Sequence, residues 1–114
     1  MSAENLIREL NQALERLAWG PDLQREFLSR HRIGPDEFAL LFDDAFLPVM
    51  GMVSEGVLPR SIAQAIVPVS EIITDMTNAG FHEWTPEAVS ESQQWAVLRR
   101  AAKKALDGLE RADS

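Results

Sequence analysis

Apolar residues recur every three or four positions along most of the chain, and this spacing predicts amphipathic helices. In the first predicted helix, residues 3–19, the apolar positions from Leu6 to Leu17 share one face, while charged side chains occupy the other. A short second helix follows the break at Gly20 and ends near His31. Proline and acidic residues at positions 35–37 then signal the start of another helix, because both suit a first helical turn.

Two longer helices are predicted for residues 35–54 and 60–78, and each contains an interior proline, Pro48 or Pro68. An interior proline removes one backbone hydrogen bond and crowds the preceding turn, so we expect both helices to be kinked. The first of them also carries Leu40, Leu47 and Met50 outside its main apolar stripe. Apolar residues on most of the circumference predict a central helix with neighbours on several sides.

A last helix is predicted for residues 86–111, and the polar stretch 90–94 could interrupt it. No alternating run of β-branched residues is long enough to predict a strand. The 114 residues fit one domain of ordinary size. The sequence therefore predicts a single all-α domain over residues 1–114, a bundle of four long helices plus one short helix.

Composition narrows the possible functions. With 11 basic and 18 acidic side chains the net charge is -7, the opposite of the basic surface that binds nucleic acid. There is no cysteine, which excludes disulfides and thiol chemistry and fits a reducing compartment. The start of the chain has no pattern of a signal peptide, and the longest uncharged stretches, 45–54 and 61–70, are too short to cross a bilayer. We therefore expect a cytoplasmic protein that contacts neither nucleic acid nor a membrane.

Patterns of catalytic residues are weak. Ser54 lacks the glycine two positions earlier that a nucleophile turn requires, and it follows a helix instead of a strand. His31 and His82 are the only histidines, and neither has a second histidine at helical spacing for a metal site. No glycine-rich loop precedes a lysine, so a phosphate cradle is not expected. The sequence predicts no enzymatic activity and no cofactor.

Two pairs of carboxylates do share a helix face at four-residue spacing. Bundle sites for two metal ions add a histidine three residues after a glutamate, and neither pair has one. A solvated face or a contact with a partner is therefore the preferred interpretation, and metal binding is the minor one. The pairs are Glu71 with Asp75, and Glu87 with Glu91.

Charge is distributed unevenly along the chain. Residues 33–98 hold ten acids against the single base Arg60, a net of -9, while the remaining residues are net +2. A surface of one sign accelerates association with an oppositely charged partner. Ordinary solubility charge and binding of a cation or small molecule are the alternatives. We interpret the acidic middle of the chain as a binding surface for a cationic protein.

One aromatic residue joins this predicted surface. Trp84 lies in a link between helices beside Glu83, where a large ring can be partly exposed and act as an interface anchor; burial as a lid over the bundle is the alternative. The phenylalanines at positions 38, 42 and 46 are expected in the core. The predicted partner-binding residues are Asp43, Asp44, Glu71, Asp75, Glu83, Trp84, Glu87 and Glu91.

Three segments, 36–44 (DEFALLFDD), 56–59 (GVLP) and 95–105 with its tryptophan and alanines, together resemble small acidic bacterial immunity proteins of polymorphic or contact-dependent toxin systems. This resemblance implies a non-enzymatic protein that binds a usually basic toxin, often a nuclease, and blocks its active site or a neighbouring surface. Segments 21–28 and 33–37 are similar to the small helical subunit of extradiol ring-opening dioxygenases, which packs on a catalytic chain. A homodimer paired through residues 38–52 is a further alternative.

Overall fold

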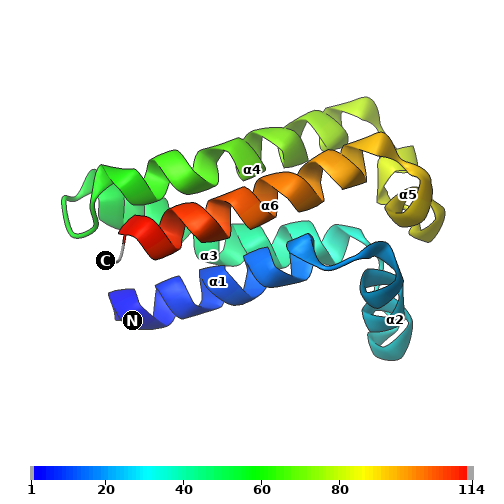
Figure 1. Cartoon of the computed structure of the whole chain (residues 1–114), viewed down its shortest axis with the longest axis horizontal. Coiled ribbons are helices and arrows are strands. Elements are labelled where there is room, and N and C mark those ends of the chain that lie inside the picture. Colours follow the sequence, from blue (N-terminus) through cyan, green and yellow to red (C-terminus); the bar gives the residue numbers. More distant parts are fainter. Residues whose placement is uncertain (1, 113–114) are drawn as a thin grey trace.

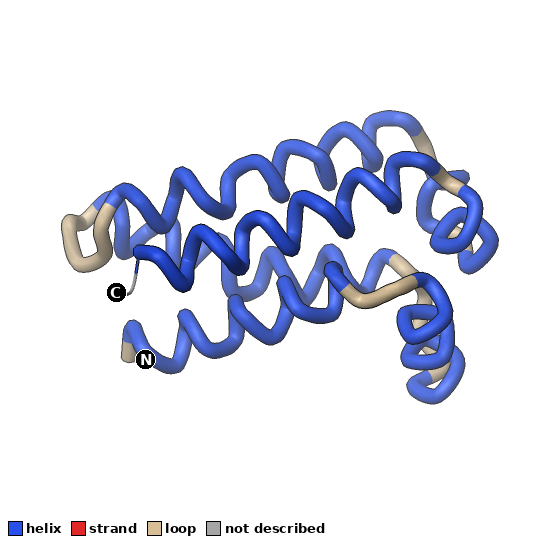
Figure 2. Tube along the Cα trace, viewed as in Figure 1, coloured by secondary structure: helices blue, strands red, loops and turns tan. Residues whose placement is uncertain are grey.

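The computed structural model describes residues 2–112, and within them every regular element is helical (Figure 2). The elements are α1 (Ala3–Ala18), α2 (Pro21–His31), α3 (Asp36–Ser54), α4 (Arg60–Ala79), the 3₁₀ turn η1 (Phe81–Trp84), α5 (Pro86–Glu91) and α6 (Gln93–Ala112). The long helices α1, α3, α4 and α6 run side by side, and α2 and α5 lie across one end of them (Figure 1). The predicted all-α bundle is confirmed.

Helix ends coincide with capping residues in the sequence. The Ser2 hydroxyl accepts a hydrogen bond from the backbone N–H of Asn5 at 3.2 Å, and the Thr85 hydroxyl accepts one from Ala88 at 3.2 Å. Such bonds satisfy N–H groups that have no partner within the first helical turn. Helix α2 ends at His31, and the next residue, Arg32, has a left-handed backbone with φ 56°.

The predicted last helix is two helices. Ser92 takes an extended conformation, with φ -77° and ψ 132°, and separates α5 from α6. Its hydroxyl donates a hydrogen bond to the Glu83 carboxylate at 2.8 Å and accepts one from the backbone N–H of Gln94 at 3.2 Å. The break therefore falls within the polar stretch where the sequence places a possible interruption.

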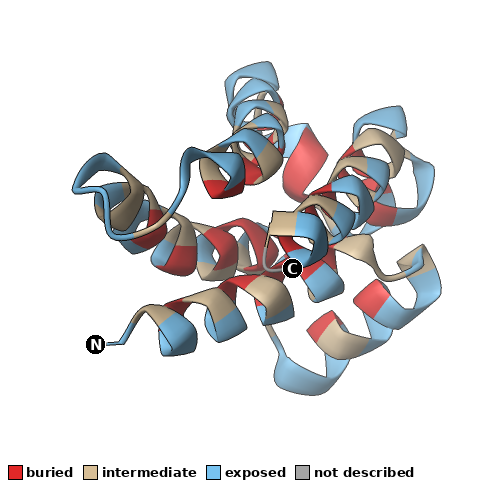
Figure 3. Cartoon of the chain, turned by 60° about the vertical axis from the view of Figure 1, so that its left-hand side comes forward, coloured by how far each residue is buried: buried red, intermediate tan, exposed pale blue. Residues whose placement is uncertain are grey.

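Around the bundle, α1 packs on α3 and α6, and α4 packs closely on α6 but more loosely on α3. Small residues allow the close approach of α4 and α6: a Cβ atom added at Gly108 would lie 3.0 Å from the Cβ of Ala65. Buried residues face the interior between the helices (Figure 3). The largest fully buried apolar side chains are Trp95, Phe38, Phe42, Leu10, Leu14, Leu17, Ile66, Met76 and Leu98.

Helices α3 and α4 continue through their interior prolines. Pro48 and Pro68 both lie at exposed positions, where the ring points away from the core. The kink expected at each proline stays a prediction. Within the described residues, no helix combines the length and the hydropathy needed to cross a membrane.

Five aromatic rings connect the elements at the end of the bundle where α2 packs. Neighbouring ring centroids lie 5.5 to 6.2 Å apart, in edge-to-face and stacked arrangements that favour aromatic pairs. The series runs from Trp19 after α1, through Phe27 of α2, Phe38 of α3 and Trp95 of α6, to Trp84 of η1. These rings join the short elements to the bundle.

A buried glutamine adds a polar connection at the same end. Gln24 of α2 is fully buried, and its Nε2 donates hydrogen bonds to the carbonyl oxygens of Arg16 and Leu17, each at 3.1 Å. Its Oε1 accepts a hydrogen bond from Arg99 Nη1 at 2.9 Å. Partial burial, with a smaller effect of the neighbouring Arg100 charge, lowers the pKa of Arg99. Gln24 therefore occupies carbonyls at the C-terminus of α1, which lack partners within the helix.

Candidate protein-interaction surface

The predicted binding residues lie on four elements. Asp43 and Asp44 belong to α3, Glu71 and Asp75 to α4, Glu83 and Trp84 to η1, and Glu87 and Glu91 to α5. Of the eight side chains, Asp44, Glu71, Asp75, Glu87 and Glu91 are exposed and Asp43 is half-buried, whereas the two on η1 are buried.

The two η1 residues are part of the interior and not of a binding surface. The Trp84 ring packs edge-to-face on Trp95, with centroids 5.6 Å apart. The Glu83 carboxylate accepts the hydroxyl hydrogen bond of Ser92, and the Glu83 carbonyl oxygen accepts one from Trp95 Nε1 at 2.6 Å. The expectation that Trp84 is an exposed anchor and Glu83 a steering charge is therefore wrong, because both serve to dock η1 on α6.

An exposed aromatic residue does lie in the same turn, three positions earlier. Phe81 is 80% exposed, the highest value among the large apolar residues of the described chain. It follows Gly80, whose positive φ of 122° ends α4 and sets the direction of the turn. The sequence predicts an exposed aromatic ring in this link, but the exposed residue is Phe81 and not Trp84, because a four-residue 3₁₀ turn can direct only some of its side chains inward.

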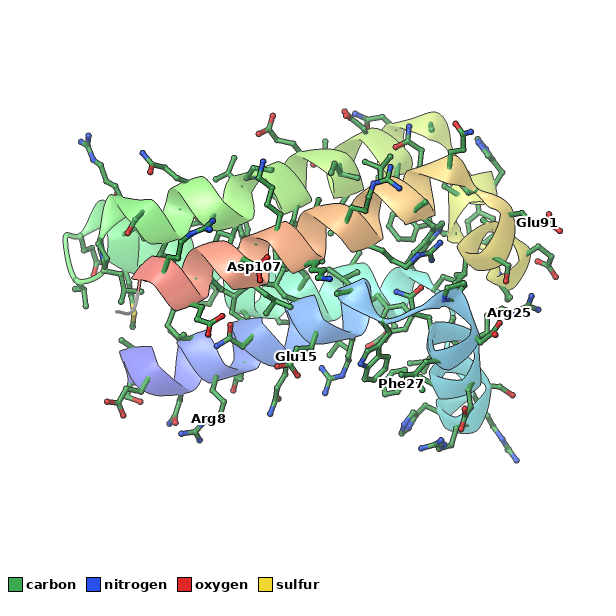
Figure 4. The ribbon with its side chains drawn as sticks, viewed as in Figure 1. Arg8, Glu15, Arg25, Phe27, Glu91 and Asp107 are labelled. Carbon is green, nitrogen blue, oxygen red and sulfur yellow. The ribbon has the colours of Figure 1, made fainter. Side chains whose placement is uncertain are left out.

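The carboxylates on α5 have a basic neighbour. The Arg25 guanidinium of α2 donates a hydrogen bond to the Ser90 hydroxyl at 3.1 Å, and Ser90 lies between Glu87 and Glu91 in α5. Figure 4 shows Arg25 and Glu91 at the same end of the molecule. A base from outside the acidic middle therefore contacts the helix that carries this pair.

The carboxylates on α4 lie beside a basic helix. The groove between α4 and α6 is lined by Pro68 and Lys104 among others, and Glu71 lies one helical turn beyond Pro68. Helix α6 also carries Arg100 and Lys103 at exposed positions. Among the described residues, no ion pair joins a base of α6 to Glu71 or Asp75.

The pair on α3 has no base on its own helix. Asp43 and Asp44 are neighbours within α3, which contains no Lys, Arg or His. Burial of the half-buried Asp43 carboxyl, and to a smaller extent the adjacent Asp44 charge, raise the pKa of Asp43. Among the described residues, neither carboxylate forms an ion pair. The same holds for the pairs on α4 and α5, so none of the three acidic pairs forms an ion pair within the described residues.

The same side of α3 is apolar and uncovered. Leu40 is 51% exposed and Leu47 is 66% exposed. At 100° per residue, positions 40, 44, 47 and 51 fall within about 60° of the helix circumference, and position 43 lies about 40° beyond position 47. This arc is on the side opposite most of the buried residues from Phe38 to Val49. Helix α3 has neighbours on several sides: it packs mainly on α1 and α4, and its Phe38 also contacts aromatic rings of α2 and α6. This outer face nevertheless meets solvent. We refer to Leu40, Asp43, Asp44 and Leu47 as the α3 outer face.

The sequence shows that Leu40 and Leu47 lie off the main stripe, but it does not show how many helices surround α3. Two leucines seven residues apart, with glycine rather than a large residue at position 51, are the signal that could have indicated an uncovered ridge. Apolar groups on an open helix face provide binding energy when a partner buries them.

The histidines do not meet the carboxylate pairs in a metal-binding arrangement. Within residues 2–112, no three side chains of His, Asp or Glu are placed to hold a metal ion. The His31 ring instead packs on Phe27, with centroids 4.4 Å apart, and His82 lies exposed in η1 beside Gly80.

Comparison with protein-family models, with curated proteins and with solved structures finds no match for this chain.

Proposed function

We propose that this chain is a non-enzymatic binding module that docks a cationic protein on the α3 outer face. One observation carries the proposal: an uncovered apolar ridge and two unpaired carboxylates occupy the same side of one helix. The resemblance to toxin-immunity proteins supports a basic toxin domain, such as a nuclease, as the partner.

The two kinds of residue on this face would contribute to binding in different ways. Burial of Leu40 and Leu47 would remove apolar surface from water and slow dissociation. Asp43 and Asp44 would attract a cationic partner and accelerate association, an effect that salt screens. Burial and, to a smaller extent, the Asp44 charge raise the pKa of Asp43. A Lys or Arg of the partner placed beside Asp43 would act in the opposite direction and favour its ionised form.

The experiment measures binding to a basic nuclease domain of a bacterial toxin, at low and high salt. For D43N/D44N we expect association about tenfold slower at low salt and a weaker dependence on salt, because the steering charge is lost. The matched control is Glu9→Gln, which removes an exposed acid of α1 on another side of the molecule. Equal association rates for both variants, or no binding of the toxin domain at all, would contradict the proposal.

A second double variant, with its own control, tests the apolar ridge formed by Leu40 and Leu47. Leu40→Ser with Leu47→Ser should weaken binding about tenfold to a hundredfold, mainly through faster dissociation. Leu23→Ser is the control, since Leu23 is 46% exposed on α2 and is not part of the α3 outer face. Because all three leucines are exposed, the variants should keep the fold and the far-UV circular dichroism of the parent.

The exposure of α3 also favours one other function, a homodimer paired through this helix. Its uncovered face is what such a dimer requires, but a two-fold axis through α3 would bring Asp43 and Asp44 of both copies together, and like charges disfavour that contact. Light scattering at neutral pH separates the two functions. We expect a monomer, and a dimer that Leu47→Glu dissociates would establish the alternative.

A further inference from the structure

A second concave surface lies between the N-terminal half of α1 and the C-terminal half of α6. It is a groove of about 800 Å³, closed at its base by the connection from α3 to α4 and the first turn of α4. In Figure 1 these halves of α1 and α6 lie at the end of the bundle away from α2. The α3 outer face lies elsewhere, because α1 and α4 separate α3 from α6 around the bundle.

The floor of the groove is apolar. Ile62 and Leu109 are buried there, and Ile7, Leu58 and Leu106 are half-buried. Partly exposed aliphatic side chains from three separate elements thus form one continuous lining. A partner that covered them would gain the burial energy that a shallow open groove leaves unused.

The rim of the groove is acidic. Glu4, Glu15 and Glu110 line it together with a single base, Arg8, and all four side chains are exposed. Figure 4 shows that Arg8 and Glu15 both project from α1. Within the described residues none of the four forms an ion pair. The rim therefore offers an excess of two negative charges to whatever covers the apolar floor.

The length of the groove limits the shape of its occupant. On α1 the lining extends from Ala3 to Glu15, which at 1.5 Å per residue is about 18 Å. This is the length of about three turns of another α-helix. An amphipathic helix would place apolar side chains at i, i+3 or i+4, and i+7 on the floor and its polar flanks against the rim.

From these observations we propose that the groove binds a three-turn amphipathic helix of a partner protein, with leucine-like residues on its inner face and Lys or Arg along its flanks. This site goes beyond the proposed function, since it lies on other helices and does not depend on the α3 outer face. A molecule with both surfaces could contact two segments of one partner.

The test uses the full chain, labelled with ¹⁵N, and a synthetic Leu/Lys amphipathic peptide of about four helical turns. We expect saturable chemical-shift changes at the backbone amides of Ile7, Asn11, Leu58, Leu106 and Leu109, which line the groove. A peptide with glutamate in place of every lysine should bind at least tenfold more weakly. A peptide of the same composition with scattered leucines should give no saturable change.

Charge reversal on the rim tests the acidic component without disturbing the core. Glu4→Lys combined with Glu110→Lys should weaken binding of the Leu/Lys peptide about tenfold and improve binding of the Leu/Glu peptide. Glu9→Lys combined with Asp107→Lys is the matched control, because these exposed acids lie on the same two helices but do not line the groove. The control should bind the Leu/Lys peptide more tightly than the rim variant does.

Four results would overturn the inference. The first is the absence of groove shifts with the Leu/Lys peptide, and the second is equal binding of all three peptides. The third is that the same amides shift with protein concentration alone, which would make a second copy of this chain the occupant. The fourth is that the amides respond only to a fatty acid such as laurate, which would make the occupant a small apolar molecule.

Discussion

Substitution of Gln24 by alanine should destabilise the fold far more than is usual for a polar residue. The side chain makes two hydrogen bonds to carbonyl oxygens at the end of α1 and accepts one from the Arg99 guanidinium. A neutral hydrogen bond contributes about 1 kcal/mol net, and one to a charged group about 2 kcal/mol. Loss of all three gives an expected cost of about 3–4 kcal/mol.

Such a cost is large against a total stability of about 5–15 kcal/mol for a domain of this size. Near the melting temperature, about 4 °C corresponds to 1 kcal/mol for roughly a hundred residues, so we expect Tm to fall by about 12–16 °C. Urea denaturation followed by far-UV circular dichroism gives the free energy of unfolding directly.

The matched control is Gln12→Ala, because Gln12 is exposed on α1 and its loss should change stability by no more than about 0.5 kcal/mol. A double variant with Arg99→Ala measures the coupling between the two side chains. If Gln24→Ala costs less than about 1 kcal/mol, or if the double variant shows no coupling, the assigned role of this hydrogen-bond network is wrong.

Three other substitutions separate the forces within the bundle. Gly51→Ala should stabilise α3 by about 0.5–1 kcal/mol, because a Cβ at Gly51 meets nothing within 4 Å; thermal unfolding measures this gain. Gly108→Ala should give no such gain and a lower Tm than Gly51→Ala, because the new Cβ would meet Ala65 at 3.0 Å and α4 and α6 would have to move apart. Asp43→Asn should be more stable than the parent at pH 7, since a raised pKa means that the folded state disfavours the ionised carboxylate. That advantage should disappear as the pH falls below about 3.8, where the carboxyl is protonated in both folded and unfolded chains; urea titrations across this range check the sign.

Local rules predict most of the helices, because capping residues and apolar spacing act within a few positions of the chain. The ends of α1, α2 and α4 agree with the pattern to about one residue. The break at Ser92 depends on a contact with Glu83 in η1, and so on tertiary structure. For the same reason the sequence identifies a polar stretch there but does not identify the residue that divides the helix.

The candidate surfaces are harder to predict, because they depend on which faces find neighbours. Leu40 and Leu47 have the composition of core residues, and their exposure follows only from the position of α3 at a corner of the bundle. Trp84 and Phe81 differ by three positions in one turn, yet one is buried and the other exposed. The long-range meeting of Gln24 with Arg99 likewise leaves no signal in local spacing.

The series of aromatic rings has a consequence for how unfolding can be observed. All three tryptophans, Trp19, Trp84 and Trp95, belong to it, so the intrinsic fluorescence of the protein originates at one end of the bundle. If the opposite end, with the groove between α1 and α6, melted first, emission would hardly change while the helical signal fell. The two spectroscopic curves would then separate, and the natural fluorophores would report which end of the molecule opens.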